Sequence, residues 1–211
     1  MILKNDIPPG RSPIGNKWIF KEKRNGQFRA RLVALGYSQV PGIDFLNNYL
    51  PVVNDTSFRI LLVLIKKNNL DAWSLDVETA FLNGELEEEI FMKIPEGLYN
   101  QEGNETSSNS VLRLKKSIYG LLQAARQWFL KFEEALKNIG FRNNQIDPCL
   151  FIKKEDSKFC AVCVYVDDCI LTGDQATMEE VIEGLKRCLP LKFKKISMIF
   201  WVATSSWESM R

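Results

Sequence analysis

The residues best suited to chemistry in this chain are carboxylates. Its 211 residues include no histidine, which removes Ser-His-Asp and Cys-His nucleophile systems and every zinc site that needs histidine. Asp76 ends an apolar run that begins at Trp73, and Asp167 and Asp168 follow the apolar run 159–166. An ionised carboxylate is costly to bury, so we expect these three to lie exposed at the ends of rigid strands.

Three carboxylates brought together repel one another, and a divalent cation relieves that repulsion. Oxygen ligands suit Mg²⁺ or Mn²⁺, and two such ions roughly 3.5–4 Å apart can drive phosphoryl transfer. The alternative is that Asp167-Asp168 is only a polar hairpin turn, where aspartate is common. Spacing alone favours neither interpretation.

Composition narrows the class of protein further. The five cysteines are an odd number, which fits a reducing compartment better than a disulfide framework. Cys160 and Cys163 lie three apart in a predicted strand and would point to opposite faces, so we interpret them as core residues. The longest strongly apolar run, 60–65, is too short to cross a bilayer, and the N-terminus lacks a signal-peptide core. We therefore expect no membrane contact and no secretion.

Charge is distributed unevenly, although the net charge is only +2. Residues 1–40 carry eight basic and two acidic side chains. Residues 71–105 carry one basic and ten acidic side chains, and residues 111–145 carry seven basic and two acidic side chains. Such runs are usually ordinary solvated surface. Two basic flanks around an acidic middle would also suit a polyanion held beside an acidic metal site, but the pattern alone is a weak indication.

Periodicity and turn signals predict the elements that must position these residues. We expect a β-ribbon from 17–21 and 28–35 around Asn25-Gly26, strands at 73–77 and 90–94, and a loop over 96–110. We expect a buried helix over 58–66 with Asp55, Thr56 or Ser57 as N-cap, and an amphipathic helix over 119–138 ended by Gly140. A hairpin from 159–166 and 169–171 would place Asp167-Asp168 at its tip, and a last helix near 178–185 would stop before Pro190.

Several ordered motifs resemble one family. Tyr165-Val166-Asp167-Asp168 matches the YVDD box of reverse transcriptases, and residues 73–84 closely resemble the first carboxylate box of copia-type retrotransposon polymerases. Residues 13–20, 30–34, 115–128 and 147–150 agree as well, in the right order from about residue 8 to 195. The chain resembles the RNA-directed DNA polymerase domain of a copia-type Pol polyprotein, truncated or altered at its C-terminus.

This resemblance implies an α+β fold, the fingers and palm of a right-hand polymerase. An antiparallel palm sheet would pack against helices, with a basic β-ribbon as the fingers extension. Residues 1–195 would form one partial domain, and residues 196–211 a divergent tail that looks frameshifted.

The resemblance also implies roles for residues. Asp76, Asp167 and Asp168 would be catalytic and would bind two Mg²⁺ or Mn²⁺ ions, together with the backbone carbonyl of Val77. Phe81 would exclude the ribose 2′-hydroxyl, although a plain core phenylalanine is the alternative. The remaining nucleotide-binding residues would be Lys17, Lys21, Arg29, Arg31, Tyr119 and Gly120, and the primer and template would contact Tyr165, Lys115, Lys116 and Arg126. For any one ribbon cation, ordinary solvated charge is at least as good an interpretation, and we interpret Trp128 as core.

The implied partners are a primed RNA or DNA template and dNTPs, in the cytoplasm or inside virus-like particles; the oligomeric state stays open. Three positions depart from the family pattern: Leu122 replaces a lysine, Ala125 a proline, and Leu35 a basic residue. With the altered tail, these departures leave a second hypothesis open: a non-catalytic retroelement remnant that at most binds nucleic acid.

Overall fold

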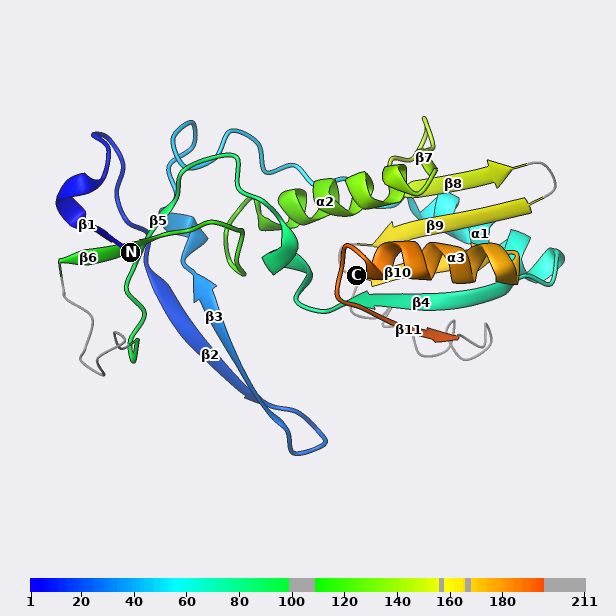
Figure 1. The fold of residues 1–211 in the computed structure, drawn as a ribbon, viewed down its shortest axis with the longest axis horizontal. Coiled ribbons are helices and arrows are strands. Elements are labelled where there is room, and N and C mark those ends of the chain that lie inside the picture. The colour runs from blue at the N-terminus through cyan, green and yellow to red at the C-terminus, as the bar shows by residue number, and fades with distance from the viewer. Residues whose placement is uncertain (99–108, 156–157, 166–167, 196–211) are drawn as a thin grey trace. The chain divides into compact units, whose positions relative to one another are not determined.

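The computed structural model describes residues 1–98, 109–155, 158–165 and 168–195 (Figure 1). The chain forms two compact units. The first unit contains residues 1–50 and 79–131, and the second contains residues 51–78 and 132–211. The expected single partial domain over residues 1–195 stays a prediction. Asp167 and the expected divergent tail lie outside the described residues.

A six-stranded antiparallel sheet forms the centre of the second unit. Its strand order is β11-β4-β10-β9-β8-β7, and every neighbouring pair is antiparallel. The strands span Asp71–Val77 (β4), Arg142–Asn143 (β7), Leu150–Glu155 (β8), Lys158–Tyr165 (β9), Asp168–Gly173 (β10) and Leu191–Lys195 (β11). The sequence pattern predicted β4, β9 and β10, and it did not predict β7, β8 or β11.

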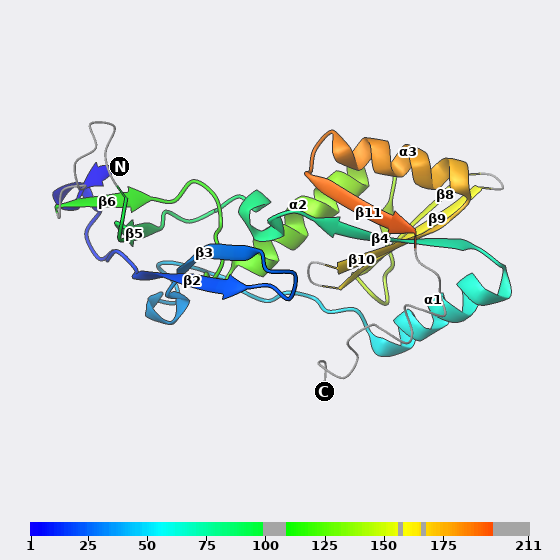
Figure 2. The same cartoon turned by 90° about the horizontal axis from the view of Figure 1, so that it is seen from below.

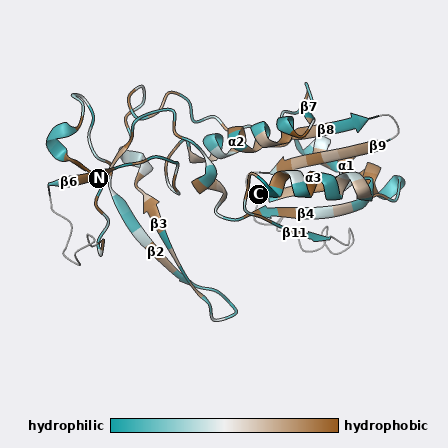
Figure 3. Ribbon diagram, viewed as in Figure 1, coloured by the Kyte–Doolittle hydropathy of each residue, from teal (hydrophilic) through white to brown (hydrophobic). Residues whose placement is uncertain are grey.

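Strand β9 is the most apolar part of this sheet, as Figure 3 shows by its brown colour. Residues 160–164 are all buried, which requires both faces of the sheet to be covered. The expectation that Cys160 and Cys163 are core residues is confirmed, since they are 0% and 2% exposed. Asp168 is not in the tip of the hairpin as expected: it is the first residue of β10 and pairs with Tyr165.

Helices α1 (Asp55–Lys67) and α3 (Gln175–Lys186) lie on opposite faces of the sheet (Figure 2). Phe58, Leu61 and Ile65 of α1 pack on one face, while α3 buries Met178, Val181, Ile182 and Leu185. As expected, α3 ends before Pro190.

Two expectations for α1 were wrong. The N-cap is Asn54, whose side chain accepts a hydrogen bond from the Thr56 N–H at 2.8 Å, so the three proposed caps lie inside the helix. The helix is also amphipathic and not fully buried, because Ile60 and Val63 are 54% and 63% exposed. A continuous apolar run concealed which of its residues face the sheet.

The first unit holds a small sheet and the predicted ribbon. The small sheet has the order β1-β6-β5, from Ile2–Leu3 (β1), Ser110–Arg113 (β6) and Phe91–Lys93 (β5). The ribbon pairs Asn16–Glu22 (β2) with Phe28–Ala34 (β3), and its turn contains Gly26 at φ +77°. A parallel bridge between Ile14 and Met92 fastens the base of the ribbon to β5.

Helix α2 (Ala124–Asn138) begins five residues later than the expected helix over 119–138. Gly120 explains the difference, because its φ of +90° is incompatible with a right-handed helix. A Cβ on Gly120 would lie 2.1 Å from the Ala34 carbonyl oxygen, so only glycine permits this approach to the end of β3. Gly140, at φ +93°, ends the helix as expected, and Trp128 is fully buried as expected.

A buried amide network fixes the loop after β3. The Gln39 side chain donates to Gln123 Oε1 at 3.0 Å, and Gln123 donates to the Asp44 carbonyl at 2.8 Å. The backbone N–H of Leu122 donates to Gln39 Oε1 at 2.8 Å. Because Gln123 is 0% exposed, losing one partner would strand buried polar atoms. The network therefore ties residues 39–44 to the segment that carries Tyr119.

None of the helices in the described part of the chain has both the length and the apolar character needed to span a bilayer.

Candidate active site

Four side chains form one row across the sheet of the second unit. The pairing register sets Asp76 of β4 opposite Asp168 of β10. The same register sets Lys192 of β11 opposite Asp76, and Tyr165 of β9 opposite Asp168. Residues that pair in an antiparallel sheet project from the same face. We call Lys192, Asp76, Asp168 and Tyr165 the cross-strand row.

The cross-strand row lies on the same face of the sheet as α1, but α1 covers only the opposite end of that face, so the row stays exposed. The residues that α1 contacts include Ala72, Ile170 and Cys163, which occupy the next two rows of the same face. Beyond them, Asp76 and Asp168 are exposed and Tyr165 is half-buried. A rigid sheet thus presents two neighbouring carboxylates to solvent.

Lys192 brings a positive charge to this row. Its Nζ forms an ion pair with Glu78, two residues beyond Asp76. The hydrogen bond to Glu78 raises the pKa of Lys192, and the charges of Glu78 and then Asp76 add to the effect. The lysine therefore stays protonated beside the carboxylates at neutral pH.

The donor set suits a hard divalent cation. Two adjacent, exposed carboxylates are the ligands that Mg²⁺ and Mn²⁺ prefer. Among the described residues there is no group of three acidic, cysteine or histidine side chains that could hold a metal, and the third expected ligand, Asp167, is not among them. The structure brings Asp76 and Asp168 together; their metal-binding roles, and that of the Val77 carbonyl, stay predictions.

In the first unit, the four predicted ribbon cations share one face. Lys21 pairs with Arg29, Arg31 pairs with Ile19, and Lys17 pairs with Val33. Like charges directly opposite each other destabilise a strand pair, so the Lys21–Arg29 pair would gain from an anion that bridges it. We call the side of the ribbon that carries Lys17, Lys21, Arg29 and Arg31 the basic face.

Tyr119 joins Arg31 of the basic face to Phe81. The Arg31 guanidinium carbon lies 4.7 Å from the centre of the Tyr119 ring, and the Phe81 ring meets the same ring edge-on with centroids 5.2 Å apart. The backbone also holds Tyr119, because its carbonyl accepts from the Ala34 N–H at 2.8 Å. Tyr119 therefore contacts both Phe81, the predicted sugar gate, and Arg31, a predicted phosphate-binding residue.

Phe81 is half-buried in a short 3₁₀ turn, Ala80–Asn83 (η3). Its backbone carbonyl accepts a hydrogen bond from the Ser117 hydroxyl, and its ring packs at the edge of a core that includes Ile90 and Met92. The ring is therefore neither fully core nor freely exposed, and its role as a gate stays a prediction.

The predicted primer and template residues of the first unit are less uniform. Lys115 and Lys116 are exposed, whereas the Arg126 guanidinium lies 3.6 Å from the Glu87 carboxylate. An ion-paired arginine has less charge to offer a phosphate. Leu122, which the resemblance suggested replaces a lysine, is 41% exposed.

Sequence reasoning missed Lys192. The alternation of Leu191 and Phe193 with Lys192 and Lys194 is a strand signal that could have revealed β11. It could not have revealed the register that sets Lys192 beside Asp76, because that depends on a partner strand far away in the chain.

Comparison with known proteins decides the family. The model of the reverse transcriptase (RNA-dependent DNA polymerase) family matches residues 3–201. The chain belongs to this family. The expected resemblance to reverse transcriptases is confirmed, and the mixed α/β structure with antiparallel sheets is compatible with such a domain.

Curated relatives of this reverse transcriptase domain come from plant transposons. The retrovirus-related Pol polyprotein from transposon TNT 1-94 of Nicotiana tabacum is 39% identical over 185 residues, covering 85% of this chain and 14% of the relative. Those from transposons RE2 and RE1 of Arabidopsis thaliana are 35% identical over 191 residues and 36% over 180, covering 88% and 82% of this chain. The chain spans 12–14% of the length of these three relatives.

Proposed function

We propose that this chain is the fingers-and-palm core of an RNA-directed DNA polymerase from a copia-type Pol polyprotein. The second unit would be palm, and the ribbon of the first unit would belong to the fingers. The observation that carries the proposal is the pairing of Asp76 with Asp168 on the exposed end of a sheet face. Family membership supports the same reaction class.

The reaction would extend a primer by one nucleotide at a time. The primer 3′-hydroxyl gives up its proton to solvent and its oxygen attacks the α-phosphorus of a dNTP; the bond between the α-phosphorus and the oxygen that bridges to the β-phosphorus breaks, and pyrophosphate leaves. Two Mg²⁺ or Mn²⁺ ions, when bound, would activate the attacking oxygen and neutralise charge on the leaving group. Asp76 and Asp168, with Asp167, would hold these ions and orient the two oxygens.

Nucleotide binding would use the first unit. Arg31, held on the Tyr119 ring, and the neighbouring cations Lys17, Lys21 and Arg29 would bind the triphosphate. Phe81 would pack against the C2′ side of the sugar and leave no room for a ribose hydroxyl. Tyr165, Lys115 and Lys116 would contact primer and template through sugars and phosphates, so binding would be largely blind to sequence.

Primer extension tests this proposal. Recombinant protein is given an oligo(dT)-primed RNA template, dTTP and Mg²⁺ or Mn²⁺, and Asp76→Asn and Asp168→Asn should each abolish extension. Asp71→Asn is the matched control, because Asp71 lies on the same strand β4 and pairs with Lys195 at 2.8 Å outside the cross-strand row. Phe81→Ala should let the enzyme incorporate rNTPs.

Two results would contradict the proposal. Wild-type extension no greater than that of Asp168→Asn would favour the non-catalytic remnant, for which the exposed Leu122 is the supporting observation. Unchanged sugar selection in Phe81→Ala would remove the gate role while leaving the polymerase proposal standing.

A further inference from the structure

The turn that carries Phe81 is short, and its closing hydrogen bond is long. η3 spans only Ala80–Asn83, and 3₁₀ turns have poorer hydrogen-bond geometry than α-helices. The Leu82 N–H donates to the Thr79 carbonyl at 2.7 Å, whereas the Gly84 N–H lies 3.4 Å from the Phe81 carbonyl oxygen. A side chain that must exclude a single hydroxyl group has to be held to within about 0.5 Å. The turn therefore needs support from outside itself.

Ser117 binds this turn at two points. Its hydroxyl donates to the Phe81 carbonyl, and its backbone N–H donates to the Gly84 carbonyl at 2.9 Å. The Ser117 side chain is 0% exposed, so its hydroxyl does not compete with surface water for the Phe81 carbonyl. We call these two hydrogen bonds the Ser117 clamp.

Gly84 gives the Ser117 clamp the space that it needs. A Cβ on Gly84 would lie 2.7 Å from the Ser117 Oγ and 2.9 Å from the backbone carbonyl carbon of Gln127 in α2. The Gly84 backbone itself is ordinary, with φ −68° and ψ 135°, so the requirement for glycine is one of space. The end of the turn therefore packs directly against Ser117 and the backbone of α2.

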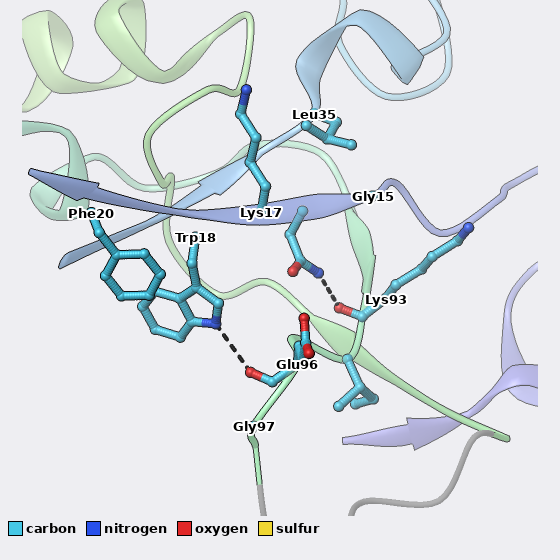
Figure 4. A pocket seen from close by; sticks show the side chains of 10 residues that line it. Gly15, Lys17, Trp18, Phe20, Leu35, Lys93, Glu96 and Gly97 are labelled. Carbon is cyan, nitrogen blue, oxygen red and sulfur yellow. Dashed lines mark hydrogen bonds between the residues drawn. The ribbon is translucent and has the colours of Figure 1, made fainter.

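The segment that carries the clamp also holds the Phe81 ring and is fastened to the base of the ribbon. The Tyr119 ring meets the Phe81 ring edge-on, and the Tyr119 carbonyl accepts from the Ala34 N–H at 2.8 Å. The next residue, Leu35, donates to the Gly15 carbonyl at 2.9 Å. Gly15 and Leu35 lie together beside a hollow next to the ribbon (Figure 4). One segment thus holds Phe81 by both backbone and ring.

We propose that Ser117 is a positioning residue for sugar selection. The clamp fixes the Phe81 backbone and thereby sets how closely the ring approaches the C2′ side of a bound nucleotide. Without the hydroxyl, the turn can shift and the ring can make room for a 2′-hydroxyl. The inference rests on the proposed gate role of Phe81 and deepens it, because Ser117 acts from the interior without touching the nucleotide.

The alternative is a purely structural role, in which the hydroxyl stabilises the fold and has no effect on sugar selection. Thr172 provides the matched comparison. Its hydroxyl also donates to a backbone carbonyl, that of Asp71 at 2.8 Å, and its side chain is also 0% exposed. It joins β10 to β4 in the second unit, whereas the clamp belongs to the first unit.

Primer extension with dUTP and with UTP, which differ only in the 2′-hydroxyl, measures sugar selection as the ratio of the two kcat/KM values. Ser117→Ala should lower this ratio about 2- to 12-fold, the range set by the net contribution of one hydrogen bond. Ser117→Cys keeps a weak donor and should give a smaller loss. Thr172→Val should lower the thermal transition and leave the ratio unchanged. In a Phe81→Ala background, Ser117→Ala should have no further effect, because Ser117 acts through that ring.

The Tyr119 ring reports the position of Phe81 without requiring catalysis. The ring current of the edge-on Phe81 ring shifts the nuclear magnetic resonance signals of Tyr119, which the Tyr119→Phe variant assigns. Phe81→Ala gives the signal positions in the absence of that ring. Ser117→Ala should move the Tyr119 signals towards those positions, and Thr172→Val should leave them where they are in wild type.

The outcomes separate this inference from the proposed function. Tyr119 signals that stay in place in Ser117→Ala overturn the clamp, whether or not the protein extends primers. Moved signals with an unchanged sugar ratio overturn the role in selection, and so does an equal further loss in the Phe81→Ala background. If Phe81→Ala itself leaves the ratio unchanged, or wild type extends no primer, the proposed function fails and the sugar role of Ser117 falls with it.

Discussion

Thr79 holds a backbone conformation that its side chain disfavours. Its φ of +52° and ψ of +42° are left-handed, which is rare for a β-branched residue and costs on the order of 1–3 kcal/mol. Its carbonyl accepts hydrogen bonds from the Leu82 N–H at 2.7 Å and the Asn83 amide at 3.3 Å, which hold the turn. The strain lies between Asp76 and Phe81 in the sequence, where backbone placement would matter most for the proposed function.

Tyr119 should act as a positioning residue for Arg31. Tyr119→Leu removes the ring face under the guanidinium, and the loss of an exposed cation–π contact should raise the KM for dNTP about 2- to 5-fold. Tyr119→Phe keeps the ring and should leave KM near the wild-type value. Steady-state extension kinetics measure both. A Tyr119→Leu variant with unchanged KM and lowered kcat would contradict the positioning role.

At the scale of elements, local patterns predicted what depends on local physics. The ribbon β2–β3 and the hairpin β9–β10 follow from alternation and turn residues, and α3 follows from its apolar spacing. The start of α2 was placed too early because Leu121 continues the apolar stripe, whereas Gly120 needs a positive φ to approach β3. No local pattern indicates that β4 lies between β10 and β11, because that order depends on strands about a hundred residues away.

The residues of the candidate site also divide into those that local sequence patterns indicate and those that only the pairing of distant strands reveals. Asp76 and Asp168 could be selected from the sequence because an aspartate next to an apolar strand is costly to bury, which suggests a functional role. That Lys192 lies beside Asp76 in the same row could be learned only from the strand pairing in the structure. The exposure of Trp18 and Phe20, 42% and 74%, was also missed: both were seen as alternating strand residues, and nothing in the sequence distinguishes an exposed aromatic side chain of a strand from a buried one.

Three buried cysteines should make the free energy of unfolding of the second unit fall at alkaline pH. Burial raises the pKa of Cys149, Cys160 and Cys163 from 9.0 to about 12. Because the folded pKa exceeds the unfolded one, the stabilisation is complete below pH 9 and is lost as pH rises towards 12. Each thiol should lower the free energy of unfolding by about 1.4 kcal/mol per pH unit in that window.

Urea unfolding at pH 8 and pH 10 checks this prediction. Cys163→Ala should start from a lower stability but lose less between the two pH values than wild type does. Cys188→Ala is the control, since Cys188 is exposed, and its loss should equal that of wild type. If Cys163→Ala and wild type lose the same free energy, the buried thiols do not govern the response.

At the scale of the whole chain, a net charge of +2 conceals a strong separation of charge. The basic ribbon belongs to the first unit, and the cross-strand row lies in the second. Proteins that bind nucleic acid through phosphates release counterions, so their affinity falls steeply with salt. The salt dependence of binding therefore reports how many ribbon cations contact phosphate.

Lys21→Gln combined with Arg29→Gln should flatten that dependence. If both cations contact phosphate, the slope of log K against log salt should shrink by about 0.9 for each. Lys66→Gln with Lys67→Gln, an equal charge change at the exposed end of α1, should leave the slope unchanged. Anisotropy titrations across a salt series give the slopes. Equal slopes for the ribbon variant and wild type would place the ribbon away from the nucleic acid.

The central claim is that Asp76 and Asp168 form a divalent cation site, and Mn²⁺ binding measured by electron paramagnetic resonance tests it without requiring catalysis. Wild-type protein should show saturable binding that Asp71→Asn retains and that Asp76→Asn and Asp168→Asn each lose. If all four proteins bind Mn²⁺ alike, or if none binds it saturably, the carboxylate pair is not a metal site and the polymerase mechanism proposed for this chain is wrong.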